Sequence, residues 1–138
     1  MTPHSSKISD VNINVISSTL NDNAGWLCQD YSGATINNCS SNGDIIASNS
    51  GGICGSYNYG NISNCTSSGN IVDDNAGGIC GSYNKGYISK CVTHGTINGF
   101  GAGGIVGPHN DANIEGCCTM GNINGKEAGG IAGNYCSG

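Results

Sequence analysis

The chain has 138 residues and a net charge of −5, and only 9% of its residues are charged. Four basic side chains are too few to follow a phosphate backbone, so this composition excludes a nucleic-acid-binding protein. The 25 glycines, the many Asn and Ser residues and the β-branched apolar residues favour short strands and tight turns, and no apolar stripe of helical period is present.

Residues 1–22 predict a degenerate half coil at the start of a repeat domain. The segment KISDVNINVISSTLND, residues 7–22, resembles the second half of the units that follow it, in looser register. No basic stretch leads into a long apolar one, so we expect neither a signal peptide nor a membrane span. The expected location is nevertheless extracellular, or on the surface of a cell or virion.

Residues 23–126 repeat with a period of 26 residues and without a gap. The four full units are Asn23–Ser48, Asn49–Asp74, Asn75–Phe100 and Gly101–Lys126. Residues 127–138 begin a fifth unit and stop about halfway, so they predict a second half coil. Because self-similarity at a fixed period indicates a repeat architecture, we expect residues 1–138 to form a single domain.

Apolar side chains recur at three positions of every unit and form three columns when the units are aligned. The columns are Leu27, Ile53, Ile79, Ile105 and Ile131; Ile36, Ile62, Ile88 and Ile114; and Ile45, Ile71, Ile97 and Ile123. Because Gly, Asn and Ser turns separate these positions, we expect three short strands per coil, with coils stacked at about 4.8 Å. The sequence therefore predicts an all-β fold, a parallel β-solenoid of about five coils, with right-handed crossovers as the more common hand.

Polar and aromatic side chains also stack in this arrangement. Two sets of asparagines predict side-chain amide ladders. They are Asn23, Asn49 and Asn75, and Asn58, Asn84 and Asn110. A further column marks one turn of each coil and contains Tyr31, Tyr57, Tyr83, His109 and Tyr135.

Seven of the nine cysteines fall in two columns. They are Cys28, Cys54 and Cys80, continued by Val106 and Ala132, and Cys39, Cys65, Cys91 and Cys117. No C-x-x-C motif is present, so support for structural zinc is weak. Coil-to-coil disulfides stay open, because stacked Cα atoms about 4.8 Å apart lie within the disulfide range. The favoured interpretation is buried free thiols that fill a narrow core, since Val106 and Ala132 replace them.

The adjacent Ile and Cys of "GGICG" pose a question of orientation. Neighbouring residues of a regular strand point to opposite faces, so one of the two columns would face outward and form an interface with another chain. A bend at the glycines would instead turn both side chains inward. We favour the first alternative, a second apolar face that another chain covers.

The residues that break the repeat do not converge on an active site. His94 and Cys118 lie in adjacent coils and could form a base–nucleophile pair, but no third group orients them. The Gly-rich segments match neither a phosphate loop nor the calcium-binding nonapeptide. We therefore expect no enzyme activity, no catalytic residue, no metal and no cofactor.

The repeat unit is similar to a known family of repeats. The segments "AGGICG", "AGGIVG" and "AGGIAG", followed by "ISNC" or "ISKC" and then "GNI" or "GTI", resemble the GLUG-type repeat over nearly all of residues 23–138. Such repeats occur in bacterial surface proteins, including stalks of secreted peptidases and adhesins, and in proteins of giant DNA viruses. The resemblance implies a β-solenoid spacer or adhesive scaffold and carries no catalytic residues.

The two ends carry the leading functional hypothesis. A solenoid end exposes unpaired backbone groups, and the two half coils of one chain would complete each other between neighbouring copies. We expect head-to-tail homo-oligomers that form a fibre or a surface layer. The predicted assembly residues are Ile8, Val11, Ile13, Ile131, Tyr135 and Cys136.

Three alternatives remain beside assembly. The chain could be an adhesion module that binds glycans or a host surface through the Tyr31, Tyr57 and Tyr83 ladder. It could also be part of a longer stalk. Ice binding is a third function, through outward columns of Thr and similar residues. Those columns are Thr35, Asn61, Tyr87 and Asn113, and Ser41, Ser67, Thr93 and Thr119.

Overall fold

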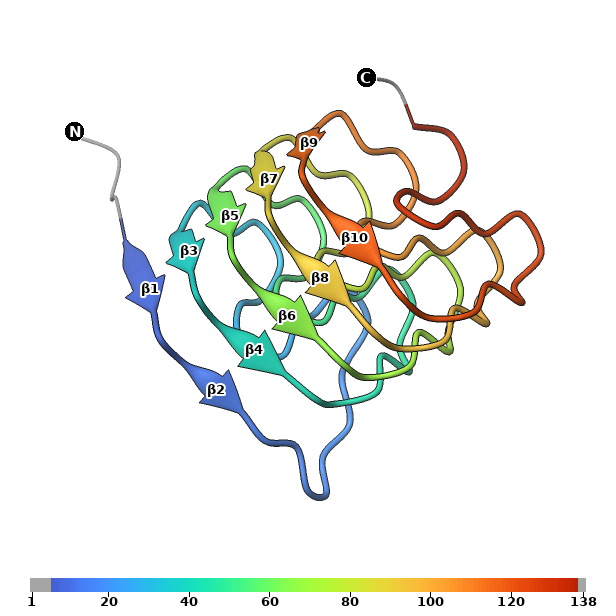
Figure 1. Ribbon diagram of the computed structural model, residues 1–138, viewed down its shortest axis with the longest axis horizontal. Coiled ribbons are helices and arrows are strands. Elements are labelled where there is room, and N and C mark those ends of the chain that lie inside the picture. Colours follow the sequence, from blue (N-terminus) through green and yellow to red (C-terminus); the bar gives the residue numbers. More distant parts are fainter. Residues whose placement is uncertain (1–5, 137–138) are drawn as a thin grey trace.

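The computed structural model describes residues 6–136, which form an all-β parallel solenoid without a helix (Figure 1). The solenoid has about four turns, slightly fewer than the five coils expected. Residues 1–5 and 137–138, the outermost parts of the two predicted half coils, lie outside the described residues.

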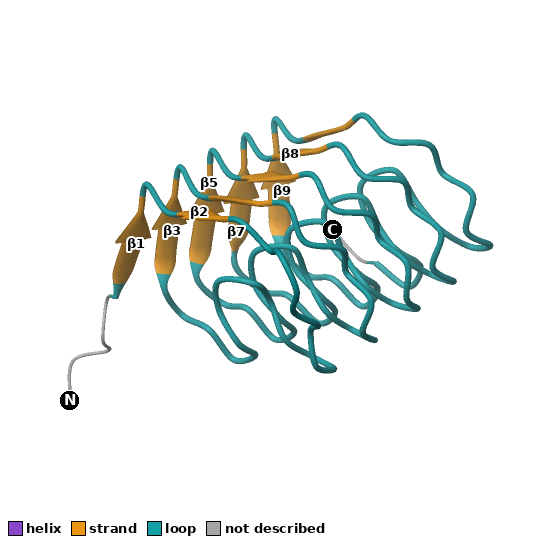
Figure 2. Cartoon of the chain, turned by 90° about the horizontal axis from the view of Figure 1, so that it is seen from below, coloured by secondary structure: helices purple, strands orange, loops and turns teal. Residues whose placement is uncertain are grey.

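Two five-stranded sheets run along the solenoid, and all pairings within them are parallel. The first sheet contains β1 (Lys7–Ser9), β3 (Thr35–Asn37), β5 (Asn61–Ser63), β7 (Tyr87–Ser89) and β9 (Asn113–Glu115). The second contains β2 (Asn12–Ile13), β4 (Ser40–Ser41), β6 (Thr66–Ser67), β8 (Val92–Thr93) and β10 (Cys118–Thr119). Figure 2 shows the successive coils stacked along one axis, with long loops closing the side away from the strands.

The register of the first sheet measures the length of each coil. Ile36 pairs with Ile62, which is 26 residues later, and the same step separates Ile62 from Ile88. Ile36 pairs in the other direction with Ile8, which is 28 residues earlier. The N-terminal coil is therefore two residues longer than the coils that follow it, which explains the looser register of its sequence.

Each full coil contains two short strands rather than the three expected. Only the column of Ile36 lies in a strand. The columns of Ile45 and Cys54 pair through single-residue parallel bridges, such as Ile45 with Ile71 and Cys54 with Cys80. Glycines and left-handed residues interrupt the extended backbone at these sites, so the stacking persists without a continuous strand.

The corner between the two strands of a coil requires a residue with a left-handed backbone. Asn38 and Asn64 occupy it with φ of 55° and 54°, and Lys90 occupies it with φ of 52°. Asparagine tolerates this conformation better than most residues with a side chain. Stacked backbones also exclude a side chain elsewhere: a Cβ added to Gly69 would lie 1.8 Å from the carbonyl oxygen of Gly43.

The expectation of a second, outward apolar face is wrong. Ile53 and Cys54 are both fully buried and belong to the same core cluster. The amides of both residues donate to one carbonyl oxygen, that of Ile79, at 2.9 Å. Consecutive amides can share one acceptor only where the backbone bends, and this bend turns both side chains into the core.

Members of the two asparagine columns that were expected to form ladders make other hydrogen bonds. Ser82 Oγ donates to Asn49 Oδ1 at 3.0 Å, and Asn84 Nδ2 donates to the carbonyl of Gly81 at 2.6 Å. Among residues 6–136, no amide–amide hydrogen bond joins members of the two columns that were expected to form ladders. Asn84 thus bonds within its own turn, whereas Asn49 accepts from Ser82 of the following coil rather than from another asparagine.

Candidate functional site: the solenoid ends, the aromatic ladder and the thiol columns

The structure places the residues that the sequence offered as candidates for chemistry apart from one another. His94 and Cys118 are both exposed, and no hydrogen bond joins them within residues 6–136. No group of three or more His, Cys, Asp or Glu side chains in these residues could hold a metal ion. No helix among them is long and apolar enough to cross a membrane.

The C-terminal end of the solenoid leaves its core uncovered. Ile97 and Ile105 are fully buried, whereas the next members of their columns, Ile123 and Ile131, are 49% and 38% exposed. The last described coil therefore repeats the apolar interior pattern at positions that no other described residue covers.

The N-terminal end also presents the core in cross-section. Four apolar side chains at this end are only partly buried: Ile8, Ile13, Leu20 and Leu27. Of these, Ile8 and Leu27 pack against the main core, and Leu20 packs against the smaller core cluster around Ile45. Val11, another predicted assembly residue, is exposed. The predicted assembly residues thus divide between the two ends, with Tyr135 and Cys136 exposed in the C-terminal half coil.

Trp26 distinguishes the first full coil from the others. Its column contains Gly52, Gly78, Gly104 and Gly130 in the later coils. The Trp26 indole lies against Gly43 and donates from Nε1 to the Gly43 carbonyl at 3.1 Å. A bulky ring is accommodated here, where the neighbouring coil is the longer N-terminal one.

The aromatic column forms a continuous stack along the solenoid. Neighbouring ring centroids lie 4.7 to 5.1 Å apart and the rings are within 6° of parallel, from Tyr31 through His109 to Tyr135. All five residues have left-handed φ between 54° and 60°. Because the rings cover one another, the interior members offer mainly their edges to solvent, and among the described residues Tyr31 and Tyr135 are the two rings with one face that no other ring of the stack covers.

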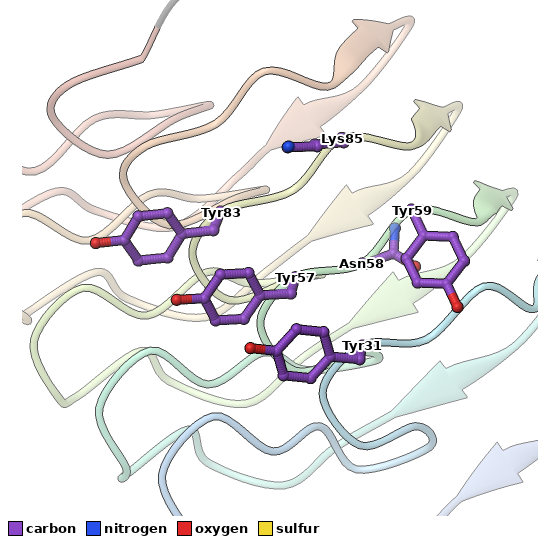
Figure 3. Close-up of a pocket in the computed structure, with 6 residues that line it drawn as sticks. All are labelled: Tyr31, Tyr57, Asn58, Tyr59, Tyr83 and Lys85. Carbon is purple, nitrogen blue, oxygen red and sulfur yellow. The ribbon is translucent and has the colours of Figure 1, made fainter.

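A groove of about 180 Å³ lies beside this stack (Figure 3). Its lining consists of Tyr31, Tyr57, Asn58, Tyr59, Tyr83 and Lys85. Tyr59, which is 63% exposed, faces the groove from the side opposite the ladder. Sequence reasoning missed Tyr59 and Lys85. Both occupy the column that begins at Gly33, and the gain of large side chains in this column was the available signal.

The two thiol columns are free of disulfides and fill the core. Five of the seven thiols are buried, and Cys28 and Cys117 are half-buried at opposite ends of their columns. A hydrogen bond from the Cys91 thiol lowers the pKa of Cys117 to about 7. The hydrogen bond with Cys54, followed by burial, raises the pKa of Cys28 well above the usual range of a thiol.

The second column proposed for ice binding faces the core. Ser41, Ser67 and Thr93 are at most 3% exposed. Thr93 Oγ1 lies 3.0 Å from Thr119 Oγ1, so the two hydroxyl groups hydrogen-bond to each other. Only the column of Thr35, Asn61, Tyr87 and Asn113 remains outward, and it does not present paired rows of Thr.

A model of the GLUG motif matches residues 47–72 of the chain. No curated protein and no solved structure matches it. The matched segment spans one period of the repeat and includes the bend at Ile53 and Cys54, the stacked Tyr57 and strands β5 and β6.

Proposed function

Since the chain is a GLUG-type β-solenoid repeat protein, we propose that it is a structural protein whose copies stack head to tail into filaments or a surface layer, without a catalytic step. The observation that carries this proposal is the uncovered core at both ends. Burying apolar surface stabilises an interface by about 25 cal/mol per Å², and head-to-tail contacts that do not close on themselves build filaments.

If the next copy is placed one coil beyond the C-terminal end, each of its columns continues the same column of the first copy. The C-terminal half coil of one copy and the N-terminal coil of the next would together form one complete coil. Ile8 of the next copy would cover Ile114, and Leu27 would cover Ile131. Apolar residues would thus meet at both positions, as they do between Ile62 and Ile88 inside the chain.

Charge and aromatic stacking agree with this contact between the C-terminal end of one copy and the N-terminal end of the next, which we call the joint. Lys126 and Asp22 occupy one column, so the joint would place opposite charges next to each other. Tyr135 is 74% exposed and Tyr31 is 62% exposed, whereas Tyr57 and Tyr83 are 38% and 40% exposed. Stacking Tyr31 of the next copy on Tyr135 would continue the aromatic ladder and cover both free ring faces.

Gly130 offers a test that separates folding from assembly. A Cβ added to Gly78 or Gly104 would lie 2.0 or 2.1 Å from a carbonyl oxygen of the following coil. A Cβ added to Gly130 meets only Ile123 Cδ1, at 3.3 Å. Gly130→Ala should therefore leave the isolated chain folded but obstruct the joint, where Trp26 of the next copy would take the place of the following coil.

The experiment is electron microscopy and sedimentation velocity of the untagged protein over a range of concentrations. We expect filaments with an axial repeat of about 24 Å, five steps of about 4.8 Å. Gly130→Ala should reduce the assembled fraction at least tenfold, since a steric clash at an interface costs more than 1.4 kcal/mol. His94→Ala, a change of an exposed side chain away from the ends, is the matched control. A monodisperse monomer at high concentration would refute the proposal.

The groove beside the aromatic ladder favours a second candidate function, the binding of extended glycans. Tyr59 offers an exposed ring, and Lys85 supplies a charged group along the same groove. Aromatic rings with nearby polar groups suit the alternating apolar and hydroxyl surfaces of sugars. A glycan array tests this function: Tyr59→Ala should abolish a signal that Gly130→Ala leaves intact.

A further inference from the structure

The thiol column contains one stacked pair at the C-terminal end that differs from the rest. Val92 of β8 pairs in parallel register with Cys118 of β10, so the preceding residues, Cys91 and Cys117, lie one above the other. Cys91 is fully buried, and Cys117, on the last described coil, is half-buried. Parallel neighbours are about 4.8 Å apart, which lies within the range of Cα separations that a disulfide spans.

Both thiol groups already point to the same side of the backbone. Cys91 Sγ donates to the carbonyl of Ser89 at 3.3 Å, and Cys117 Sγ approaches the carbonyl of Glu115 at 3.6 Å. Each thiol thus contacts the carbonyl two residues before it in its own coil. The equivalent orientation of the two side chains places their sulfur atoms next to each other across the coil boundary.

We propose that Cys91 and Cys117 form a dithiol site that exchanges with disulfides of small thiols. Cys117 is the attacking thiol and Cys91 is the resolving thiol. The site needs only the last two coils of one chain, and it is accessible only while this end is free, because the proposed joint would stack Val11 of the next copy on Cys117.

Exposure and electrostatics together assign these two roles, because Cys65, whose pKa the hydrogen bond with Cys91 also lowers, is fully buried, whereas Cys117 is only half-buried. The hydrogen bond from Cys91 lowers the pKa of Cys117 to about 7, whereas the hydrogen bond with Cys117 raises the pKa of Cys91. The thiolate is the nucleophile in disulfide exchange, and an attacking thiol reacts best when its pKa lies near the ambient pH. Cys28, the half-buried thiol at the opposite end of the other column, has a raised pKa and is expected to remain protonated.

The reaction balances with one small disulfide as the oxidant. The Cys117 thiolate attacks one sulfur of oxidised glutathione, forming a mixed disulfide and releasing one glutathione thiolate. Cys91 Sγ then attacks the Cys117 sulfur, its proton passes to the departing thiolate, and a second glutathione leaves. Two protein thiols are oxidised to one disulfide while one disulfide is reduced to two thiols, and Cys91 needs no access to solvent because its target is the neighbouring sulfur.

The test uses a full-length variant in which the other two exposed thiols are removed, Cys118→Ser with Cys136→Ser. After treatment with oxidised glutathione, peptide mapping should find a Cys91–Cys117 disulfide, two glutathiones released per chain and none retained. Adding Cys91→Ala, which places the residue found at Ala132 of the other column, should trap glutathione on Cys117 with one released.

The pH dependence and the competition between thiols complete the test without a core variant. The initial rate should be half-maximal near pH 7, because the thiolate is the reacting form and the pKa of Cys117 is about 7. At pH 6, a thiol with this pKa carries roughly 30-fold more thiolate than an ordinary thiol with a pKa of about 8.5. Cys28 should react more slowly than Cys117. Retention of glutathione on Cys117 in the presence of Cys91, a midpoint above pH 8, or faster reaction at Cys28 would each overturn the proposal.

Discussion

The first and the last described coils of the solenoid differ in how closely they follow the repeat. The N-terminal coil is two residues longer than the others, and the first full coil carries Trp26 where all later coils carry glycine. The C-terminal coil keeps the interior pattern, with Ile123 and Ile131 in their usual columns although both are substantially exposed. One end therefore departs from the repeat, and the other continues it at positions where nothing covers the core.

This difference illustrates that the repeat sequence is suited to a coil that has another coil stacked on each side of it. In a solenoid, stability is approximately the sum of the coils and of the contacts between adjacent coils. A residue such as isoleucine contributes fully only when a coil lies on each side of it. The same side chain in the last coil is thus a candidate contact for a second copy, which is how the structure supports the proposed assembly.

The largest expected difference in stability comes from truncating one isoleucine in an interior coil and one in the last full coil. Ile97→Ala removes a fully buried side chain and should lower the free energy of unfolding by about 3 kcal/mol. Ile123→Ala, in the same column but half exposed, should cost about 1 kcal/mol in the monomer. Urea unfolding at a concentration below assembly measures both. Equal losses would contradict the view that the last coil is uncovered.

Glycine supplies a second comparison with a smaller expected effect. A Cβ at Gly78 would lie 2.0 Å from the Gly104 carbonyl oxygen, so Gly78→Ala should destabilise the chain by about 2 kcal/mol as the coils are forced apart. Gly130→Ala should change the free energy of unfolding by less than about 0.5 kcal/mol, because its Cβ meets one flexible side-chain atom. Thermal unfolding of the two variants provides the measurement, and a large loss in Gly130→Ala would remove it as a selective probe of assembly.

The 26-residue period allowed the stacking to be predicted from the sequence. In a parallel solenoid each residue lies on the one a full coil away, so the columns of Ile36, Cys54 and Tyr57 follow from alignment alone. The matched residues, the absence of helix and the solenoid class all depend on this periodicity. None of them requires knowledge of the path of the backbone within a coil.

The direction in which side chains point could not be predicted in the same way. Ile53 and Cys54 both face inward because their amides share the Ile79 carbonyl, and strand alternation fails at such a bend. Ser67 and Thr93 are polar but buried for a related reason: the second strand of each coil is only two residues long, and one of the two must face the core. The groove residue Tyr59 was missed because it belongs to a column of unlike side chains.

The corner between the two strands of a coil gives a third test, with a smaller expected effect on stability. Lys90 has φ of 52°, a conformation that asparagine adopts more readily than lysine. Lys90→Asn should raise the free energy of unfolding by about 0.5 to 1 kcal/mol, because the columns already contain Asn38 and Asn64 at this corner. Chemical denaturation measures the gain. A loss of stability would mean that the Lys90 side chain contributes more than its backbone costs.

The smallest expected effect concerns the charges that would meet at the joint. Lys126→Glu places a negative charge in the column that Asp22 of the next copy would occupy, and should weaken association about threefold, since exposed ion pairs contribute less than 1 kcal/mol. Asp22→Lys combined with Lys126→Glu should restore most of the association constant, because the opposite charges are exchanged, although the double variant loses the hydrogen bond that Asp22 Oδ1 accepts from the Ser48 amide at 3.0 Å. Sedimentation equilibrium at low and high salt measures all three proteins, and the difference between them should shrink as salt screens the pair. If the double variant associates no better than Lys126→Glu alone, the two charges do not meet, and the copies do not stack in the register that the columns predict.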